Sequence, residues 1–140
     1  MVATGPEHPN ADVVRALYRA MERSDVSTIR SLHADDFVAH VGGDSPVAGD
    51  WSGQALADLA ATIRTETDGT QRAEPRHIMA TDRFVAVIHR WTASRHGRSI
   101  DQETLIVYRV HDGKLAERWE FVEDQQAHDD FWSFEPPINE

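Results

Sequence analysis

Several side chains of this sequence can gain or lose a proton near neutral pH, and they fall on segments whose polar and apolar residues alternate like those of strands. Histidine has an ordinary pKa of ~6.5, so His40 and His89 are suited to general-base work. Glu120 can act as an acid or a base if burial raises its pKa, unless Arg118, two residues away, lowers it. These residue types point to proton transfer on a small molecule.

A structural role is the alternative for the same residues. His40 would then be a hydrogen-bonded residue at the end of a strand, and Arg118 and Glu120 would form a solvated ion pair. Residue type alone does not separate the two interpretations.

The composition excludes several other kinds of site. The 140 residues include no cysteine, which rules out disulfides, thiolate zinc sites and a cysteine nucleophile. His33 lies close to Asp35 and Asp36, but their spacing matches no metal-ligand pattern. The sequence contains no glycine-rich phosphate loop, serine elbow or dinucleotide fingerprint. We therefore expect neither a metal nor another cofactor.

Charge and hydropathy limit the partners. The formal net charge of −10 argues against nucleic acid and anionic membranes, because both bind basic surfaces. The longest apolar stretches, such as 84–88, are far shorter than the ~20 residues of a membrane-spanning helix. Residues 1–10 do not resemble a secretion signal, so we expect a cytoplasmic protein. The 13 Arg against one Lys, with 17 Ala, suggest a GC-rich bacterial genome.

The order of the elements predicts an α+β fold. Apolar spacing indicates helices over about 10–21, 25–32, 54–67 and 124–133. Asn10 is expected to cap the first helix and Ser52 the third. Alternation indicates strands over about 37–41, 72–80, 83–94, 99–111 and 114–122. The glycine-rich segment 42–53 is expected to be a loop.

Long hairpins that follow a long helix predict how these elements pack. We expect a cone-shaped, curved antiparallel sheet wrapped around a long helix, with N-terminal helices and an apolar pocket between them and the concave face. One domain should span residues 10–133. The segment 1–9 is expected to be a flexible N-terminus, and 134–140 a loose C-terminal tail.

Two segments carry a resemblance to a known family. They are FVAHVGGDSPVAGDWSG, at 37–53, and VYRVHDGKLAERWEFVEDQQAHDDFW, at 107–132. Together with the first helix they resemble the SnoaL-like and ketosteroid isomerase-like branch of the nuclear transport factor two-like superfamily. The resemblance implies a cystatin-like cone. It leaves the chemistry open, because this fold hosts both enzymes and binding proteins.

The resemblance also implies catalytic roles. His40 stands where ketosteroid isomerases carry a carboxylate base, and Glu120 lies near the position of the acid/base Asp of SnoaL-like cyclases. The isomerase tyrosine position corresponds to Leu17, and Tyr18 should face ~100° away from it. This offset argues against steroid-type isomerisation.

Matching the hairpins to the family pattern implies a set of substrate-binding residues on the concave face. His89 or Gln102 would hold a developing enolate oxygen, and Trp51 should lie at the pocket mouth. The full implied set is His89, Trp91, Gln102, Thr104, Ile106, Tyr108, Arg118 and Trp51.

These expectations predict a cofactor-independent acid/base enzyme, similar to polyketide cyclases or isomerases, acting on a hydrophobic, carbonyl-bearing small molecule. His40 would be the base and Glu120 the partner acid. One alternative is a non-catalytic small-molecule-binding or accessory protein of the same fold. Another is an epoxide hydrolase-like enzyme, for which Arg118 and Glu120 are a partial match, although that chemistry needs a second carboxylate.

The convex face of the predicted sheet is unusually apolar, and such a face is commonly covered by a second subunit. We therefore expect a homodimer. The residues of this convex apolar face are Phe84, Ile88, Leu105, Val107, Trp119 and Phe121.

Overall fold

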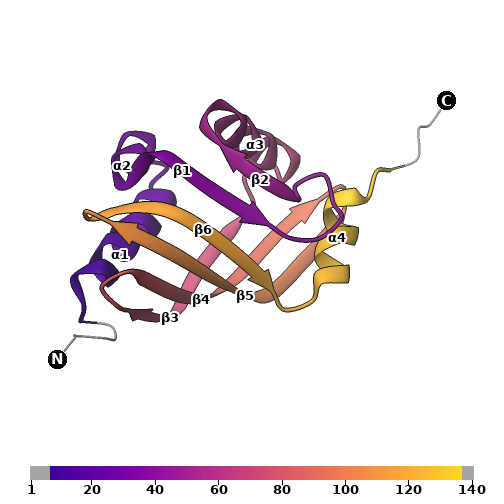
Figure 1. The fold of residues 1–140 in the computed structure, drawn as a ribbon. Coiled ribbons are helices and arrows are strands. Elements are labelled where there is room, and N and C mark those ends of the chain that lie inside the picture. The colour runs from indigo at the N-terminus through magenta and orange to yellow at the C-terminus, as the bar shows by residue number, and fades with distance from the viewer. Residues whose placement is uncertain (1–6, 137–140) are drawn as a thin grey trace.

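The computed structural model describes residues 7–136, which form four helices and six strands (Figure 1). The helices are α1 (Pro9–Glu22), α2 (Val26–Leu32), α3 (Gly53–Glu66) and α4 (Gln125–Ser133). The strands are β1 (His33–Val41), β2 (Gly49–Ser52), β3 (Arg72–Ala80), β4 (Phe84–Arg95), β5 (Arg98–His111) and β6 (Lys114–Val122). No helix in this part of the chain is long and apolar enough to cross a membrane.

A single curved, open sheet contains these strands in the order β2–β1–β6–β5–β4–β3 (Figure 1). Neighbouring strands are antiparallel except β1 and β6, which run parallel. Helix α1 packs against β3 and β4, α3 against β1 and β2, and α4 against β5. The predicted α+β class with a curved sheet is confirmed.

Alternation along the two longest strands creates an inner face of buried side chains. On β4 the buried positions run with a period of two from Val85 to Arg95, and on β5 from Ile100 to Val110. The turns at the two ends of β5 each have two residues with positive φ: His96 and Gly97 have φ values of 49° and 77°, and the Asp112–Gly113 turn is similar. Such turns match the twist of the strands that they join.

Two clusters of buried apolar side chains lie at opposite ends of this inner face. The larger unites α1 with the middle of the sheet, through residues such as Leu17, Val87 and Ile106. The smaller consists of Val47, Trp91, Ala93, Ile100, Phe131 and Trp132. Between Val87 and Trp91 on β4 stands His89, whose β5 partner is Thr104. A polar row therefore separates the two clusters.

The segment expected to be a loop, 42–53, contains a short strand. Residues of β2 pair with β1 from Val38↔Ser52 to Val41↔Gly49. This strand is only four residues long, and the glycines and the proline at 46 in the same segment are typical of a loop. Strand β1 also begins at His33, four residues earlier than expected, because its first residues pair with β6.

Both ends of the described chain make specific contacts. His8 rather than Asn10 caps α1, through its Nδ1, which accepts from the Asn10 amide at 3.0 Å. Its Nε2 lies 2.9 Å from an Asp82 carboxylate oxygen. At the other end Arg95 binds Glu66, Glu135 and the carbonyl oxygens of Phe131 and Phe134, and we call this group the Arg95 clamp.

These contacts hold residues 8–9 and 134–135, which the sequence assigned to a flexible N-terminus and a loose tail. Residues 1–6 and 137–140 of the two predicted segments lie outside the described residues.

Gly43 should be intolerant of a side chain. Its φ is +95°, and an added Cβ would collide with the side chains of Gln125 and Asp129 on α4. We expect Gly43→Ala to lower the unfolding free energy by more than the ~1–2 kcal/mol that a left-handed backbone costs an L-residue. Gly113→Ala is the matched control, because its φ is +74° and nothing lies within 4 Å of its added Cβ. Equal losses in thermal or urea melts would contradict the packing of this loop on α4.

Candidate functional site

The inner face carries the substrate-binding residues that the resemblance implied on β4 and β5. All of them are buried, because each lies on the inner side of its strand. Their roles in binding stay predictions. They are His89, Trp91, Gln102, Thr104, Ile106 and Tyr108.

Strand β6 adds a charged pair to the same face. Arg118 is the register partner of Tyr108, and Glu120 is the partner of Ile106. Partners across an antiparallel ladder project to one side of a sheet, so both charged side chains point inward. Both are half-buried rather than solvated, unlike the surface ion pair that was the alternative.

A chain of neighbouring polar side chains links this pair to α1 and β4. The Tyr18 hydroxyl lies 2.7 Å from His89 Nδ1. Tyr108 lies close enough to Tyr18 and Arg118 for each to influence the pKa of the others. The chain thus runs from His89 through two phenols to a guanidinium, and it crosses the interior from one strand to another.

Burial sets the protonation of this chain. It lowers the pKa of His89 to about 4, and the positive charge of Arg118 adds to the effect. Burial also raises the pKa of Tyr18 and of Tyr108 above the usual range. Burial alone would lower the pKa of Arg118, because it disfavours the charged form. Glu120 and the two phenols have the larger combined effect, and the pKa of Arg118 is raised. At neutral pH the chain therefore consists of a neutral imidazole, two neutral phenols and one cation.

Three buried polar atoms of the described residues have no hydrogen-bond partner: Thr104 Oγ1, Arg118 Nε and His128 Nδ1. His128 lies on α4 with its ring against Trp91, the ring centroids 5.5 Å apart. Buried polar groups are normally satisfied, so each such atom calls for an explanation. The inner face therefore carries hydrogen-bonding atoms that no protein group binds.

His40 does not join this group. Strand β1 buries Phe37 and Ala39, which places His40 on the outer face of the sheet, away from Glu120. Its ring stacks on Trp119, whose neighbours in sequence, Arg118 and Glu120, project inward. The expected acid/base pair of His40 and Glu120 is therefore not brought together.

The outer face gives His40 two carboxylate partners instead. Its Nδ1 lies 2.7 Å from an Asp50 oxygen, and its Nε2 lies 2.5 Å from Glu117. Arg109 donates to the other Glu117 oxygen at 3.2 Å. The hydrogen bonds to Asp50 and Glu117 raise the pKa of His40, and His40 lowers the pKa of Glu117. This outer-face group ties β2 and β5 to the parallel junction of β1 and β6.

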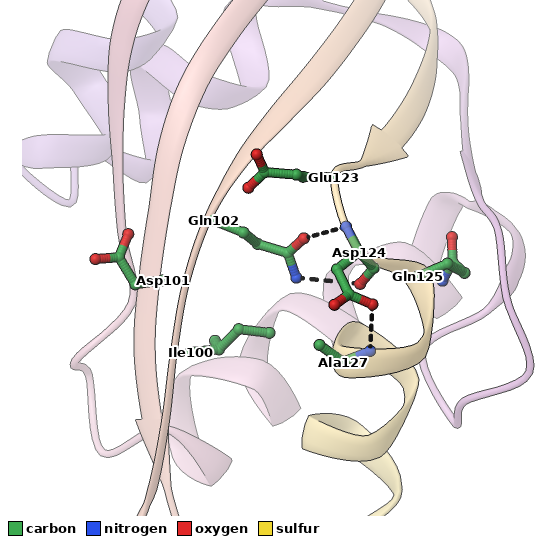
Figure 2. A pocket seen from close by; sticks show the side chains of 7 residues that line it. All are labelled: Ile100, Asp101, Gln102, Glu123, Asp124, Gln125 and Ala127. Carbon is green, nitrogen blue, oxygen red and sulfur yellow. Dashed lines mark hydrogen bonds between the residues drawn. The ribbon is translucent and has the colours of Figure 1, made fainter.

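Gln102 and Trp51 already have protein partners. Gln102 Oε1 accepts from the Asp124 amide at 2.8 Å, and Gln102 Nε2 donates to the Asp124 carbonyl oxygen at 3.4 Å (Figure 2). The Asp124 side chain caps α4 by accepting from the Ala127 amide. Trp51 Nε1 donates to the Val47 carbonyl oxygen at 3.0 Å. Gln102 therefore positions α4, and Trp51 stabilises the loop between β1 and β2.

The junction of β5, β6 and α4 forms an open hollow of about 500 Å³. Its lining includes three carboxylate residues, Asp101, Glu123 and Asp124, and no aromatic side chain (Figure 2). It thus differs from the apolar pocket that the sequence predicted. Within residues 7–136 no three metal-ligating side chains are arranged to hold an ion.

Sequence reasoning missed two members of the inner group, Tyr18 and His128. The one-residue offset from Leu17 predicts that Tyr18 faces away from the site. Both residues are buried, however, and the Tyr18 hydroxyl reaches His89. The signal for His128 was its position on one apolar stripe of α4 with Phe131 and Trp132.

The outer-face group should stabilise the fold in a pH-dependent manner. The pKa of His40 is raised in the folded state, so its contribution is complete below the ordinary value of ~6.5 and is lost as the pH rises through the raised value. Melting temperatures of the wild type and His40→Gln should differ most below pH ~6.5 and converge as the pH rises through the raised pKa of His40. His77→Gln, at an exposed position on β3, is the control and should show no such trend. A difference that grows with pH would contradict the assignment.

Comparison with known proteins identifies the family. The chain matches the SnoaL-like domain over residues 14–118. An uncharacterised protein of Mycobacterium tuberculosis is 30% identical over 128 residues, which cover 87% of this chain and 95% of that protein.

Two solved structures are similar to the whole fold. Bal32a, from a soil-derived mobile gene cassette, has a TM-score of 0.83 and 33% identity, covering 89% of this chain and 96% of its own. IdmH of Streptomyces antibioticus, a candidate polyketide cyclase, has a TM-score of 0.69 and 23% identity, covering 83% and 93%. The second likeness concerns the fold alone. Because the domain match spans most of the chain, the chain belongs to the SnoaL-like family of the nuclear transport factor two-like superfamily.

Proposed function

We propose that this protein is a cofactor-independent enzyme that moves a proton on a hydrophobic, carbonyl-bearing small molecule held at the inner face, with Glu120 as the acid/base group. One observation carries the proposal. Glu120 is half-buried and projects inward as the register partner of Ile106, and its charge acts on Tyr18, Tyr108, Arg118 and His128.

Each neighbour of Glu120 has a distinct role in the proposed reaction. Glu120 removes a proton from carbon and later returns it. The cation of Arg118 stabilises the negative charge that develops on the substrate oxygen. With its lowered pKa, His89 is a poor base, so it orients the Tyr18 hydroxyl instead. Trp91 and Ile106 supply apolar contact on either side of the polar row.

The family and its members support this proposal. SnoaL-like proteins bind small molecules, and IdmH, which has the same fold, is a candidate polyketide cyclase. Cyclisation and isomerisation of carbonyl compounds both begin with removal of a carbon-bound proton. His40 has no role in this scheme, because it lies on the outer face with Asp50 and Glu117.

A model carbon acid tests proton transfer. 5-Nitrobenzisoxazole has an aromatic body, and removal of its C–H proton breaks the N–O bond to give a coloured phenolate. We expect turnover by the wild type and a loss of roughly 10²–10⁴-fold in Glu120→Gln, which keeps the shape but not the titratable proton.

The controls are Glu123→Gln, an exposed residue that follows β6, and His40→Gln, on the outer face. Both should retain the wild-type rate. Wild-type protein without turnover, or a Glu120→Gln variant with an unchanged rate, would contradict the enzyme and favour the binding protein.

We also propose that two copies of the chain associate through the convex apolar face. Phe84 and Phe121 are 39% and 55% exposed there, a costly arrangement for large apolar side chains in water. Ile88, Leu105 and Phe121 also line a hollow of about 230 Å³ on this face, which an apolar side chain of a second copy would fill. A stable interface there would bury more than ~1,000 Å².

Light scattering tests this association. We expect the mass of two chains for the wild type at micromolar concentration and of one chain for Phe121→Asp, because a buried, unpaired carboxylate disfavours the interface. Phe121 is exposed in the single chain, so the substitution should leave folding intact. Ala57→Asp, on the exposed side of α3, is the control and should remain dimeric. A wild type with the mass of one chain would overturn the proposal.

A further inference from the structure

Helix α4 covers the end of the inner face that carries Trp91. The Trp91 side chain is buried, and three rings of α4 lie against it. The ring centroids of His128, Phe131 and Trp132 are 5.5, 5.9 and 5.9 Å from that of Trp91. A small molecule that reaches Trp91 from this end must therefore displace the helix.

The N-terminal end of α4 is joined firmly to the sheet. Only two residues separate it from β6, and Gln102 of β5 forms two hydrogen bonds with the main chain of Asp124 (Figure 2). The first residue of the helix, Gln125, donates to the Gly42 carbonyl oxygen at 3.4 Å. The open hollow of about 500 Å³ borders the same connection. Residues 123–124 are thus bonded on one side and open on the other, as a hinge requires.

The C-terminal end of α4 is attached mainly through one side chain, Arg95. This buried guanidinium donates to the carbonyl oxygens of Phe131 and Phe134, and at 2.8 Å to Glu135. Arg98 lies over the Phe134 ring, 3.7 Å from its centroid. Glu135 itself is exposed. Part of the charge of Arg95 is therefore balanced by a carboxylate that lies beyond the helix and faces water.

The closed position of α4 leaves a polar atom unsatisfied. His128 Nδ1 is buried without a hydrogen-bond partner, and the Asp129 carboxylate oxygen is 3.9 Å away. Water would bind this atom if α4 moved, which offsets part of the cost of exposing Phe131 and Trp132. The packing of these two rings still favours the closed position, so an open form is a minor population.

We propose that α4 and residues 134–136 form a lid, hinged at residues 123–124 and latched by the Arg95 clamp, whose opening gives a small molecule access to Trp91. What the lid admits rests on the proposed function, whereas the lid itself rests on the contacts at the two ends of α4. Helix α3 borders the same cluster through Leu59 and Ile63, but it packs against β1 and β2. Its movement should therefore leave α4 in place.

A single cysteine beneath the lid measures opening, because the chain has no cysteine of its own. Ala93 is 4% exposed and lies on β4 between Trp91 and Arg95, on the same inner face. The rate at which iodoacetamide labels Ala93→Cys, followed by mass spectrometry, reports how often a small molecule reaches this position. Val85→Cys is the control, because Val85 is buried on the same face of β4 but in the larger cluster.

Loss of the latch should speed labelling beneath the lid. In Ala93→Cys we expect Glu135→Gln to raise the labelling rate by roughly 2–5-fold, the effect of losing an exposed ion pair. Arg95→Met removes every contact of the clamp and should raise the rate by about 10-fold or more. The rate of Val85→Cys in the same backgrounds is the reference and should rise less.

Glu66→Gln tests which helix moves, because it removes the other carboxylate of the clamp, at the end of α3. Its effect on Ala93→Cys should be smaller than that of Glu135→Gln. An equal or larger effect would make α3 the lid and overturn the proposal. Unchanged labelling in Glu135→Gln, or an equal rise at Val85→Cys, would also overturn it. None of these rates involves turnover, so failure to convert 5-nitrobenzisoxazole would contradict the proposed enzyme but not the lid.

Discussion

The interior of this protein is organised around a charge that is difficult to bury. Removing a guanidinium from water is costly unless its charge and its donors are satisfied. Arg118 is balanced by Glu120 two residues away on the same strand and by the Tyr108 phenol across the ladder. Tyr108 in turn engages Tyr18, which reaches His89. The side chains around this one cation thus come from one helix and three strands.

This arrangement explains why the inner face is not one continuous apolar core. The polar row cannot be covered by apolar side chains without stranding its donors, so the apolar residues divide into two clusters on either side of it. The smaller cluster is completed by Phe131 and Trp132 of α4. The helix that closes the interior is therefore held by aromatic packing and by the Gln102–Asp124 hydrogen bonds.

Local signals predicted much of the fold. The two long hairpins could be read from alternation and from the His96–Gly97 and Asp112–Gly113 turns, because these features depend on neighbouring residues alone. The register of this hairpin, together with the alternation of side chains along a strand, puts Thr104 and its neighbours on the inner face.

The face of His40 could not be read in this way. Strand β1 has a register shift between His33 and Val38 where it pairs in parallel with β6, and a shift of one residue exchanges the two faces of a strand. That irregularity depends on a strand about 80 residues later in the sequence, which local spacing does not record. For the same reason the direction of Tyr18 depends on how α1 is rotated against β4, and a one-residue offset on a helix does not fix it.

Helix α3 shows a further consequence of how the elements are attached. It has no buried residue, its Ser52 N-cap forms no side-chain hydrogen bond, and its last residue, Glu66, is held by the Arg95 clamp. Strand β4 instead pairs with β5 over its whole length. Amide hydrogens should therefore exchange with solvent early in α3 and late in the central hairpin, so that local stability falls outward from the hairpin to the helix. The part of the molecule that opens first is thus tethered at its C-terminal end, and transient opening there exposes the interior while the polar row stays assembled.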